Sequence, residues 1–489
     1  MRPTKFVALL AIPAQLAFGQ QAPTTGRGLS LEQAIDIARQ NNPSLQETRN
    51  LVRNADATVR QAYSALLPNA SASIGAGYTQ AGTQIVQGLQ FTGTNSYNGS
   101  YRLGLGYNVS AAAAFAPRAA RANRAAAEAT VTSASEALRS LVTTQYIQAL
   151  AQQATAALND TLVQTAKGQL DLADAKMEVG AGTILDVRNA EVALGQAQVA
   201  ALQAHNQARI ERVKLFQQMG VPADTSVQLT TTFTVAAKPP ASLDSLISLA
   251  RRVNPDIAAK RSTEYADQMQ VRTAQTAYLP SLSLSTGIGG TSFGTSRNTD
   301  SLVAAASLNA QAQFQGCLLQ DSILTGAGLA PRGSCALRPV TETQIQNIRN
   351  SNDPFAFSKS PISLSAFVTL PIFNNYQREA QLEQARVARD NANYDLKARN
   401  LQLTSDVTTA YLNLEAAEKT VELQQTIAQQ AAQALAFADE SYRVGAKTFL
   451  DLTTARGVFV QASVGRVNAI YSYHQAFANL EAAVGRPLR

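Results

Sequence analysis

Residues 70–78 read ASASIGAGY, a stretch in which apolar and small polar side chains alternate one by one. The same alternation returns at 102–109, at 281–288 and at 362–370, where Phe367 is the one exception. A period of two over about ten residues is typical of strands with one face on lipid and the other on water. It suits a half-buried soluble sheet equally well, so the pattern alone leaves both interpretations open.

Two very long helical segments follow the second and the fourth of these strands. Residues 111–179 contain no Gly or Pro except Pro117 and Gly168, and residues 375–444 contain no Pro. At 1.5 Å per residue such a helix is about 100 Å long, so neither segment fits a compact globule unless it bends back. The chain then carries an apolar seam with spacings of three and four, typical of coiled-coil packing: Leu452, Ala455, Phe459, Ala462, Ile470, Tyr473, Phe477, Leu480 and Val484.

The chain reads as one unit written twice. Asn42-Pro43 recurs as Asn254-Pro255, an offset of 212 residues, whereas residues 142–146 recur at 407–411, an offset of 265. The change of offset places a 53-residue insertion between the third and fourth strand patterns. A repeat this long indicates tandem duplication and not a short-period solenoid.

We therefore predict a mixed α and β fold, mainly α, built from two structural repeats. The first repeat, 20–236, is expected to hold strands near 69–80 and 100–110 and a long helix pair over 111–219, with its turn at 179–183. The second repeat, 237–489, is expected to hold strands near 281–290 and 360–371, an inserted loop at 291–359, and a long helix pair over 375–484 with its turn at 444–448.

Residues 1–19 read as a secretory signal peptide. Arg2 and Lys5 form the positive start, residues 6–12 the apolar core, and residues 17–19 a cleavage site of small side chains. No other segment has the run of about 18 apolar residues that a membrane helix needs. No cysteine follows the signal core, so we expect the protein not to be lipid-anchored.

The two cysteines, Cys317 and Cys335, both lie in the insertion. In the oxidising compartment that the signal peptide implies, we expect them to form a disulfide that closes a long loop. Two free thiols are the alternative.

Composition and motifs favour neither an enzyme nor a nucleic-acid-binding protein. The formal charge of +7 is scattered along the sequence without a basic run. The two histidines, His205 and His474, do not coincide in the repeat, and the sequence has no metal-ligand spacing of His, Cys and Asp. It also has no phosphate-binding glycine loop and no convergent acid, base and nucleophile. We expect no catalysis, no metal and no cofactor.

Two strands per repeat make four per chain, which limits how the strands can exist in a membrane. An open four-stranded sheet cannot lie in lipid, because the amides at its edges would be unpaired, and four strands are too few to close a barrel. If the strands are in a membrane, several chains must share one barrel. A dimer, trimer or tetramer would give eight, twelve or sixteen strands.

The residues resemble the TolC family of outer-membrane efflux proteins over essentially the whole mature chain. The resemblance rests on the duplicated order of strands and helices, on the strand-to-helix join at 369–373, and on the Val-Gly-x-x-Thr turns followed by Asp at 179–186 and 444–451. It implies a homotrimer with a twelve-stranded transmembrane β-barrel in the outer membrane of a Gram-negative bacterium, continuous with a long periplasmic α-helical coiled-coil barrel. Gly106 stands where Pro371 stands in the second repeat, so the first join departs from the pattern.

The resemblance also implies a passive outer-membrane export channel of a tripartite efflux or type I secretion system. Its partners would be a periplasmic membrane-fusion adaptor and, through the adaptor, an inner-membrane pump of RND or ABC type. The turns that match the adaptor-binding tips contain Gly180, Gly182, Thr183, Gly445 and Thr448. Glycine and threonine make tight turns without any partner as well, which is the alternative interpretation.

Four further residues match the pore gate of the family: Asp186, Asp451, Tyr442 and Lys447. Threefold symmetry would arrange each aspartate in a ring of three carboxylates that attracts cations. The alternative is that each Asp simply stabilises the start of a helix. Thr454 stands where some relatives carry a second Asp, so we do not expect a double ring.

A secreted structural coiled coil or surface adhesin is the alternative function. It explains the helices and the signal peptide, but not four alternating strands at duplicated positions. The sequence does not identify the exported substrate.

Overall fold

The computed structural model describes residues 28–86, 89–92, 94–224, 226–235, 242–296, 298–331, 333–353 and 355–488. The predicted signal peptide at 1–19 lies outside these residues. The chain forms two units, a helical unit of Met1–Asn54, Ala125–Glu264 and Ala392–Arg489 and a sheet unit of Ala55–Arg124 and Tyr265–Asn391.

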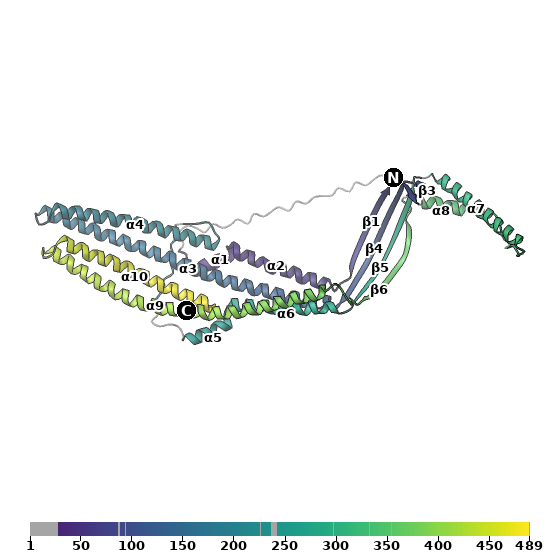
Figure 1. Cartoon of the computed structure of the whole chain (residues 1–489). Coiled ribbons are helices and arrows are strands. Elements are labelled where there is room, and N and C mark those ends of the chain that lie inside the picture. The colour runs from purple at the N-terminus through teal and green to yellow at the C-terminus, as the bar shows by residue number, and fades with distance from the viewer. Residues whose placement is uncertain are drawn as a thin grey trace, which may run out of the picture. The chain divides into compact units, whose positions relative to one another are not determined.

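The sheet unit is built on one antiparallel sheet of four strands in the order β1, β4, β5, β6 (Figure 1). The strands are β1 (Asn69–Thr79), β4 (Ser96–Ser110), β5 (Ser281–Thr295) and β6 (Ser358–Thr369), and β2 (Thr83–Val86) pairs with β3 (Leu89–Thr92) in a separate hairpin. The outer strands β1 and β6 each have one partner within the sheet, so their outer edges are open. A register shift between Gly287 and Gly289 interrupts the pairing of β5 with β6.

The alternation seen in the sequence separates the two faces of this sheet. Ile74, Leu364 and Val368 lie on the apolar face and are 88%, 81% and 73% exposed. The opposite face carries mainly serine and glycine, with Asn, Thr, Arg102, Phe293 and Phe367 at its other positions, and we call it the serine–glycine face. β4 and β5 extend beyond the predicted 100–110 and 281–290, to Ser96 and Thr295, and the two strands pair with each other along this added length.

The prediction of an inserted loop at 291–359 needs correction. Strand β5 continues to Thr295, and the following residues form α7 (Thr299–Gly326) and α8 (Glu342–Ser351). The segment is rich in Ala, Leu and Gln, which favour helices, and the Asn298 side chain accepts a hydrogen bond from the N–H of Asp300 at the start of α7. Cys317 in α7 and Cys335 are joined by a disulfide, with Cα atoms 5.7 Å apart.

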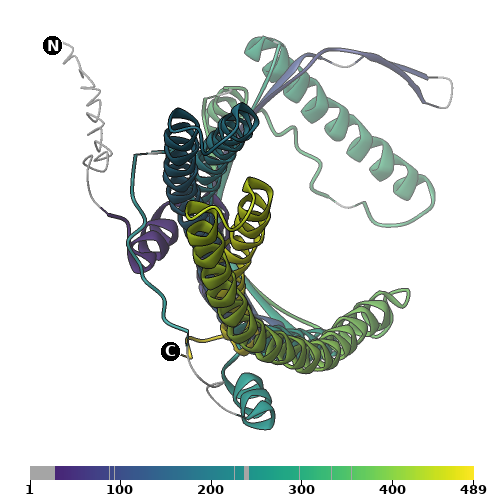
Figure 2. The ribbon, with the colours of Figure 1, turned by 90° about the vertical axis from the view of Figure 1, so that its left-hand side faces the viewer.

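Two long hairpins, α3 (Ala111–Glu178) with α4 (Ile184–Met219) and α9 (Gln377–Arg443) with α10 (Phe449–Val484), lie mainly in the helical unit, and α3 and α9 begin in the sheet unit. Seen along the helices, the hairpins lie side by side (Figure 2). Small side chains permit close approach, and the buried positions recur at the offset of 265, as for Val142 and Val407, which are both fully buried. Among the described residues, no helix has both the length and the apolar character required to cross a membrane.

Each hairpin ends against an Asn-Pro corner between two short helices. These corners join α1 (Leu31–Asn41) to α2 (Pro43–Ser64), and α5 (Leu243–Val253) to α6 (Pro255–Gln275), which a short 3-10 turn at Thr276–Tyr278 follows. The Asn42 side chain accepts a hydrogen bond from the N–H of Leu45 at 3.1 Å and donates one to the Gln218 carbonyl of α4 at 2.8 Å. Asn254 likewise donates to the Ala483 carbonyl of α10 at 3.0 Å. The two corners therefore hold the two hairpins in the same way.

Candidate functional site: the paired helical turns

The first turn joins α3 to α4. Gly180 has a φ of +76°, which favours glycine, and its N–H donates to the carbonyl of Met177 at 3.0 Å. The N–H groups of Ala181 and Gly182 both donate to the carbonyl of Lys176, at 2.8 and 3.0 Å. A Cβ atom on Gly182 would lie 3.1 Å from Lys176 Cβ, so a side chain here would need a small shift of Lys176.

A capping box restarts the helix after this turn. Thr183 Oγ1 accepts from the N–H of Asp186 at 3.2 Å, and the Asp186 carboxylate accepts from the Thr183 N–H at 3.1 Å and from its hydroxyl at 2.8 Å. Two N–H groups that the helix itself leaves unpaired are thereby satisfied. Within the chain, Asp186 therefore fills the structural role of a helix N-terminal residue.

The second turn, between α9 and α10, repeats these bonds. Gly445 has a φ of +78° and its N–H donates to the Tyr442 carbonyl at 3.1 Å. The N–H groups of Ala446 and Lys447 donate to the Ser441 carbonyl at 2.8 and 3.2 Å. Lys447 thus occupies the position of Gly182 in a turn of the same bonding pattern.

Thr448 and Asp451 form the second capping box. The Asp451 carboxylate accepts from the Thr448 N–H at 3.0 Å and from its hydroxyl at 2.8 Å. These two hydrogen bonds and, to a smaller extent, the charge of Lys447 hold the pKa of Asp451 below its usual value. Asp451 and Lys447 line one hollow together with Thr454 and Phe437. The carboxylate is exposed and ionised at neutral pH, so it can act on passing ions.

Tyr442 is buried between the two hairpins. It belongs to one apolar cluster with Ala173 and Val187 of the first hairpin and with Phe449 of the second. Its hydroxyl has no hydrogen-bond partner among the described residues. Burial raises the pKa of Tyr442, and the negative charge of Asp186 adds to the effect.

Lys176 makes a contact that sequence reasoning missed. Its Nζ lies 3.9 Å from the centroid of the Tyr442 ring and donates a hydrogen bond to the Tyr442 carbonyl. The ammonium therefore ties the end of α3 to the end of α9. The sequence offered one signal for this contact: at the repeat offset of 265, Lys176 corresponds to Ser441, so the charge is present in one repeat and absent from the other.

Arg456 is a second contact of this kind. It is buried and its guanidinium donates to the side chain of Gln169 at 3.0 Å, from α10 to α3. Burial lowers the pKa of Arg456. At the offset of 265, Glu191 takes the place of Arg456 in the first hairpin, on an exposed surface.

Of the four predicted gate residues, Tyr442 alone packs into the contact between hairpins, whereas Lys447 forms no ion pair with any described residue.

A buried acid lies further along the first hairpin, on α4. The Glu211 carboxylate accepts hydrogen bonds from Gln145 at 2.8 Å, from Gln207 at 3.0 Å and from Lys214 at 2.8 Å. Burial alone would raise the pKa of Glu211, but the hydrogen bonds and the charge of Lys214 outweigh it and lower the pKa. The network has the character of a structural ion pair, with every acceptor occupied.

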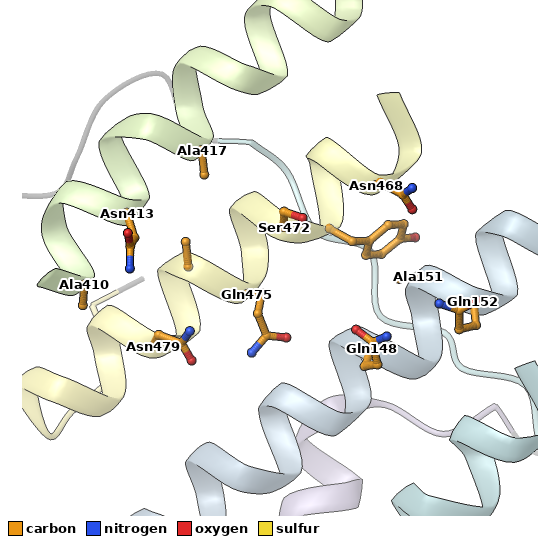
Figure 3. A pocket seen from close by; sticks show the side chains of 12 residues that line it. Gln148, Ala151, Gln152, Ala410, Asn413, Ala417, Asn468, Ser472, Gln475 and Asn479 are labelled. Carbon is orange, nitrogen blue, oxygen red and sulfur yellow. The ribbon is translucent and has the colours of Figure 1, made fainter. Parts of the chain in front are cut away.

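A polar hollow of about 420 Å³ lies between α3, α9 and α10 (Figure 3). Its lining side chains carry amides and hydroxyls but no charge: Gln148, Gln152, Asn413, Asn468, Tyr471, Ser472, Gln475 and Asn479, with four alanines. Such a lining can hydrogen-bond water or a neutral polar molecule. Among the residues that line it, Tyr471 alone is titratable, and none is a carboxylate, histidine, lysine or cysteine.

The arrangement combines a sheet with open edges and two long helical hairpins that end in paired, charged turns. An apolar sheet face and unpaired strand edges are features that a membrane barrel satisfies, with lipid on the face and strand pairing at the edges. The family model of the outer membrane efflux protein matches residues 34–221 and 337–486. The chain therefore belongs to the outer membrane efflux protein family.

Solved structures share this fold over nearly their full length. The outer membrane protein VceC from Vibrio cholerae is 18% identical, with a TM-score of 0.67 over 94% of this chain and 97% of that one. The CmeC outer membrane channel of Campylobacter jejuni is 18% identical, with a TM-score of 0.67 over 99% and 94%. CusC is 16% identical, with a TM-score of 0.68 over 99% of both chains. A comparison with curated proteins gave no match.

Proposed function

We propose that this chain is the outer-membrane export channel of a tripartite efflux or type I secretion system. Three copies would share a twelve-stranded barrel and continue as a helical tunnel through the periplasm. The conduit would be passive and without catalytic activity, and its partners would be a periplasmic adaptor and, indirectly, an inner-membrane pump.

The observation that carries this proposal is the sheet. One face of it exposes large apolar side chains, such as Ile74 and Leu364, and both outer strands have open edges. Exposed edges and an exposed apolar face are costly for a protein in water. Pairing β1 of one copy with β6 of the next would satisfy the edges, and lipid would cover the apolar face. A secreted coiled coil, the alternative function, gives these two features no purpose.

The turns would supply docking and gating. Gly180, Gly182, Thr183, Gly445 and Thr448 shape the two turns that an adaptor would contact. Asp186 and Asp451 would form rings of carboxylates around the pore, while Tyr442 and Lys447 would stabilise the closed arrangement. The exposed, ionised carboxylate of Asp451 makes it the stronger candidate of the two rings, since Asp186 is partly covered.

Conductance of the purified chain in planar bilayers tests the proposal. We expect detergent-stable trimers that form discrete ion-conducting channels. Asp451→Ala should raise the single-channel conductance and weaken block by multivalent cations, because three negative charges leave the constriction. A monomeric, water-soluble protein without conductance would overturn the proposed function, and unchanged conductance and block would remove Asp451 alone from the gate.

Docking is tested by site-specific crosslinking in the native host. Gly182 is partly covered and a Cβ atom there would lie 3.1 Å from Lys176 Cβ, whereas Lys447 and Ala181 are exposed on the two turns. A photocrosslinking side chain at Lys447 or Ala181 should capture a periplasmic adaptor. The same group at Lys419, an exposed residue on the body of α9, serves as the control and should capture none.

A further inference from the structure

The four strands of the sheet contain only two charged side chains, Arg102 in β4 and Lys359 in β6, and no carboxylate. Arg102 is paired with Gly289 of β5, whereas Lys359 is paired with Gly290. Adjacent residues of a strand point to opposite faces. Arg102 is therefore the one charge on the serine–glycine face of the described sheet, and Lys359 belongs to the apolar face.

Small residues surround Arg102 on all sides. Across the sheet its row continues with Ser73 in β1 and Gly289 in β5, and Ser360 of β6 pairs with Gly289. Along its own strand, Ser100 and Gly104 share its face. Gly289 has no side chain, so nothing from β5 lies over the arginine stem in this row. The guanidinium is exposed, and with the described residues it forms neither an ion pair nor a hydrogen bond.

The two faces of the sheet differ in how well they tolerate a charged side chain. The apolar face would contact lipid, where an arginine near the bilayer midplane costs about 2–4 kcal/mol. Lys359 tolerates that face because it lies at the start of β6, next to Phe357, whose ring packs on Tyr101 with centroids 5.5 Å apart. An aromatic pair beside a lysine is typical of the membrane interface, where the ammonium reaches water. Arg102, by contrast, is the only charged residue on the serine–glycine face of the described sheet.

We propose that Arg102 is a specificity-determining residue that favours the passage of anions, above all oxyanions, through the barrel. The inference rests on the proposed function, under which the serine–glycine face lines the lumen. Three copies of the chain then present three guanidiniums in a wall of mainly small and polar side chains, whose strands carry no carboxylate. Arginine matches carboxylate and phosphate groups with two parallel hydrogen bonds, so anionic substrates of that chemistry gain most.

The same chain would thus carry charges of opposite sign at two levels, Arg102 in the sheet unit and Asp451 in the second turn. An exposed charge acts in water over roughly one Debye length, about 10 Å at 0.1 M salt and 30 Å at 0.01 M. The contribution of Arg102 is therefore expected to grow as the salt concentration falls. The carboxylates of Asp451 favour cations and would mask the contribution of Arg102 to anion selectivity. The selectivity is therefore measured both in the wild type and in a variant without the Asp451 carboxylate.

The test is the reversal potential of purified full-length trimers in planar bilayers under a KCl gradient, in the wild type and in Asp451→Ala. In each background, Arg102→Gln should lower the ratio of chloride to potassium permeability by about threefold near 0.1 M salt, and Arg102→Glu by more. Arg102→Lys should keep the chloride preference but lose the additional preference for inorganic phosphate over chloride. Lys359→Gln, on the opposite face, is the matched control and should leave the ratio unchanged.

Trimer formation by each variant, checked by gel mobility before and after heating, ensures that selectivity and not folding is measured. If Arg102→Gln conducts with the wild-type reversal potential in both backgrounds, the assignment of Arg102 is wrong while the channel function stands. If the wild-type chain forms no conducting unit in any salt, the proposed function itself fails, and the two failures are distinguishable.

Discussion

The two hairpins, α3–α4 and α9–α10, have the same backbone but differ in the side chains that surround it. Both turns use a glycine with positive φ, and both use a Thr-x-x-Asp capping box with matching hydrogen bonds. The Gly, Thr and Asp of the two turns recur at an offset of 265, and so do apolar contacts between the hairpins such as Ala173 with Ala438, whereas the contacts of Lys176 and Arg456 do not. Met177 stands opposite Tyr442 in this alignment, and Gly182 opposite Lys447. The two turns therefore share their local backbone requirements, whereas some of the polar contacts between the hairpins differ.

The same contrast is sharper in the middle of the helices. Gln145, Gln207, Glu211 and Lys214 form the buried network on the first hairpin, and at the offset of 265 their places are taken by Ala410, Ser472, Ala476 and Asn479. All four of these replacements line the polar hollow of Figure 3. The α3–α4 hairpin therefore carries a charged network at these positions, whereas the equivalent positions of the α9–α10 hairpin line a neutral hollow. A hollow permits more local movement than a filled site does.

Glycine replacement at the turns should have the largest effect, and it should be equal in the two hairpins. Gly180→Val and Gly445→Val each force a branched residue into positive φ, at a cost of roughly 2–3 kcal/mol. The denaturation midpoint of the helical circular dichroism signal in detergent measures this cost. Gly168→Ala, an exposed position inside α3 with open space around it, is the control and should stabilise by about 0.5–1 kcal/mol. A large difference between the two valine variants would contradict the equivalence of the turns.

Removal of the buried carboxylate should have an intermediate effect that is confined to the first hairpin. Glu211→Ala leaves Gln145, Gln207 and Lys214 without their shared acceptor, which should cost about 2 kcal/mol. Glu191→Ala is the matched control on the same helix, since it removes an exposed carboxylate paired with Arg188 at 2.7 Å and should cost at most about 0.5–1 kcal/mol.

The pH dependence of the same pair of variants adds a signed test. The pKa of Glu211 in the folded protein lies below its usual value of 4.5. Its contribution to stability is therefore present above pH 4.5 and is lost as the pH falls below this value, through the folded pKa. The difference in denaturation midpoint between the wild type and Glu211→Ala should shrink over that range. A difference that stays constant would mean that the carboxylate charge contributes nothing.

The outline of the fold could be read from the sequence, because it depends on local patterns. Alternation identified the strands of the sheet, the absence of Pro identified the long helices, and the Asn-Pro and Gly-x-x-Thr patterns located the corners. The helices inside the insertion were missed, since the segment lacks the apolar periodicity that marks a packed helix, and α7 buries none of its residues. A helix held by a cap, by propensity and by the disulfide at Cys317 leaves little periodic signal.

The turn residues of the site were equally readable, whereas the contacts between hairpins were not. Thr183, Asp186, Thr448 and Asp451 follow a local motif and form the capping boxes that such a motif predicts. The contact of Lys176 with Tyr442 joins residues 266 positions apart, so it depends on how two hairpins pack. Comparison of the repeats would have pointed to it, because unlike residues at equivalent positions mark the divergent contacts.

The smallest predicted effect concerns the hydroxyl of Tyr442, and it separates two versions of the gate. The contacts of Tyr442 with Lys176 use the ring and the backbone carbonyl, and both survive in Tyr442→Phe. That variant removes a buried hydroxyl without a described partner, so it should be neutral or stabilising by at most about 1 kcal/mol. Tyr442→Leu removes the ring and should raise conductance in planar bilayers. Met177→Leu, at the equivalent position of the first hairpin, is the control and should change neither the stability nor the conductance. If Tyr442→Phe raised the conductance as much as Tyr442→Leu does, the hydroxyl would have to form a hydrogen bond to another copy of the chain. The difference between Tyr442 and Met177 would then serve assembly and not the contact within one chain.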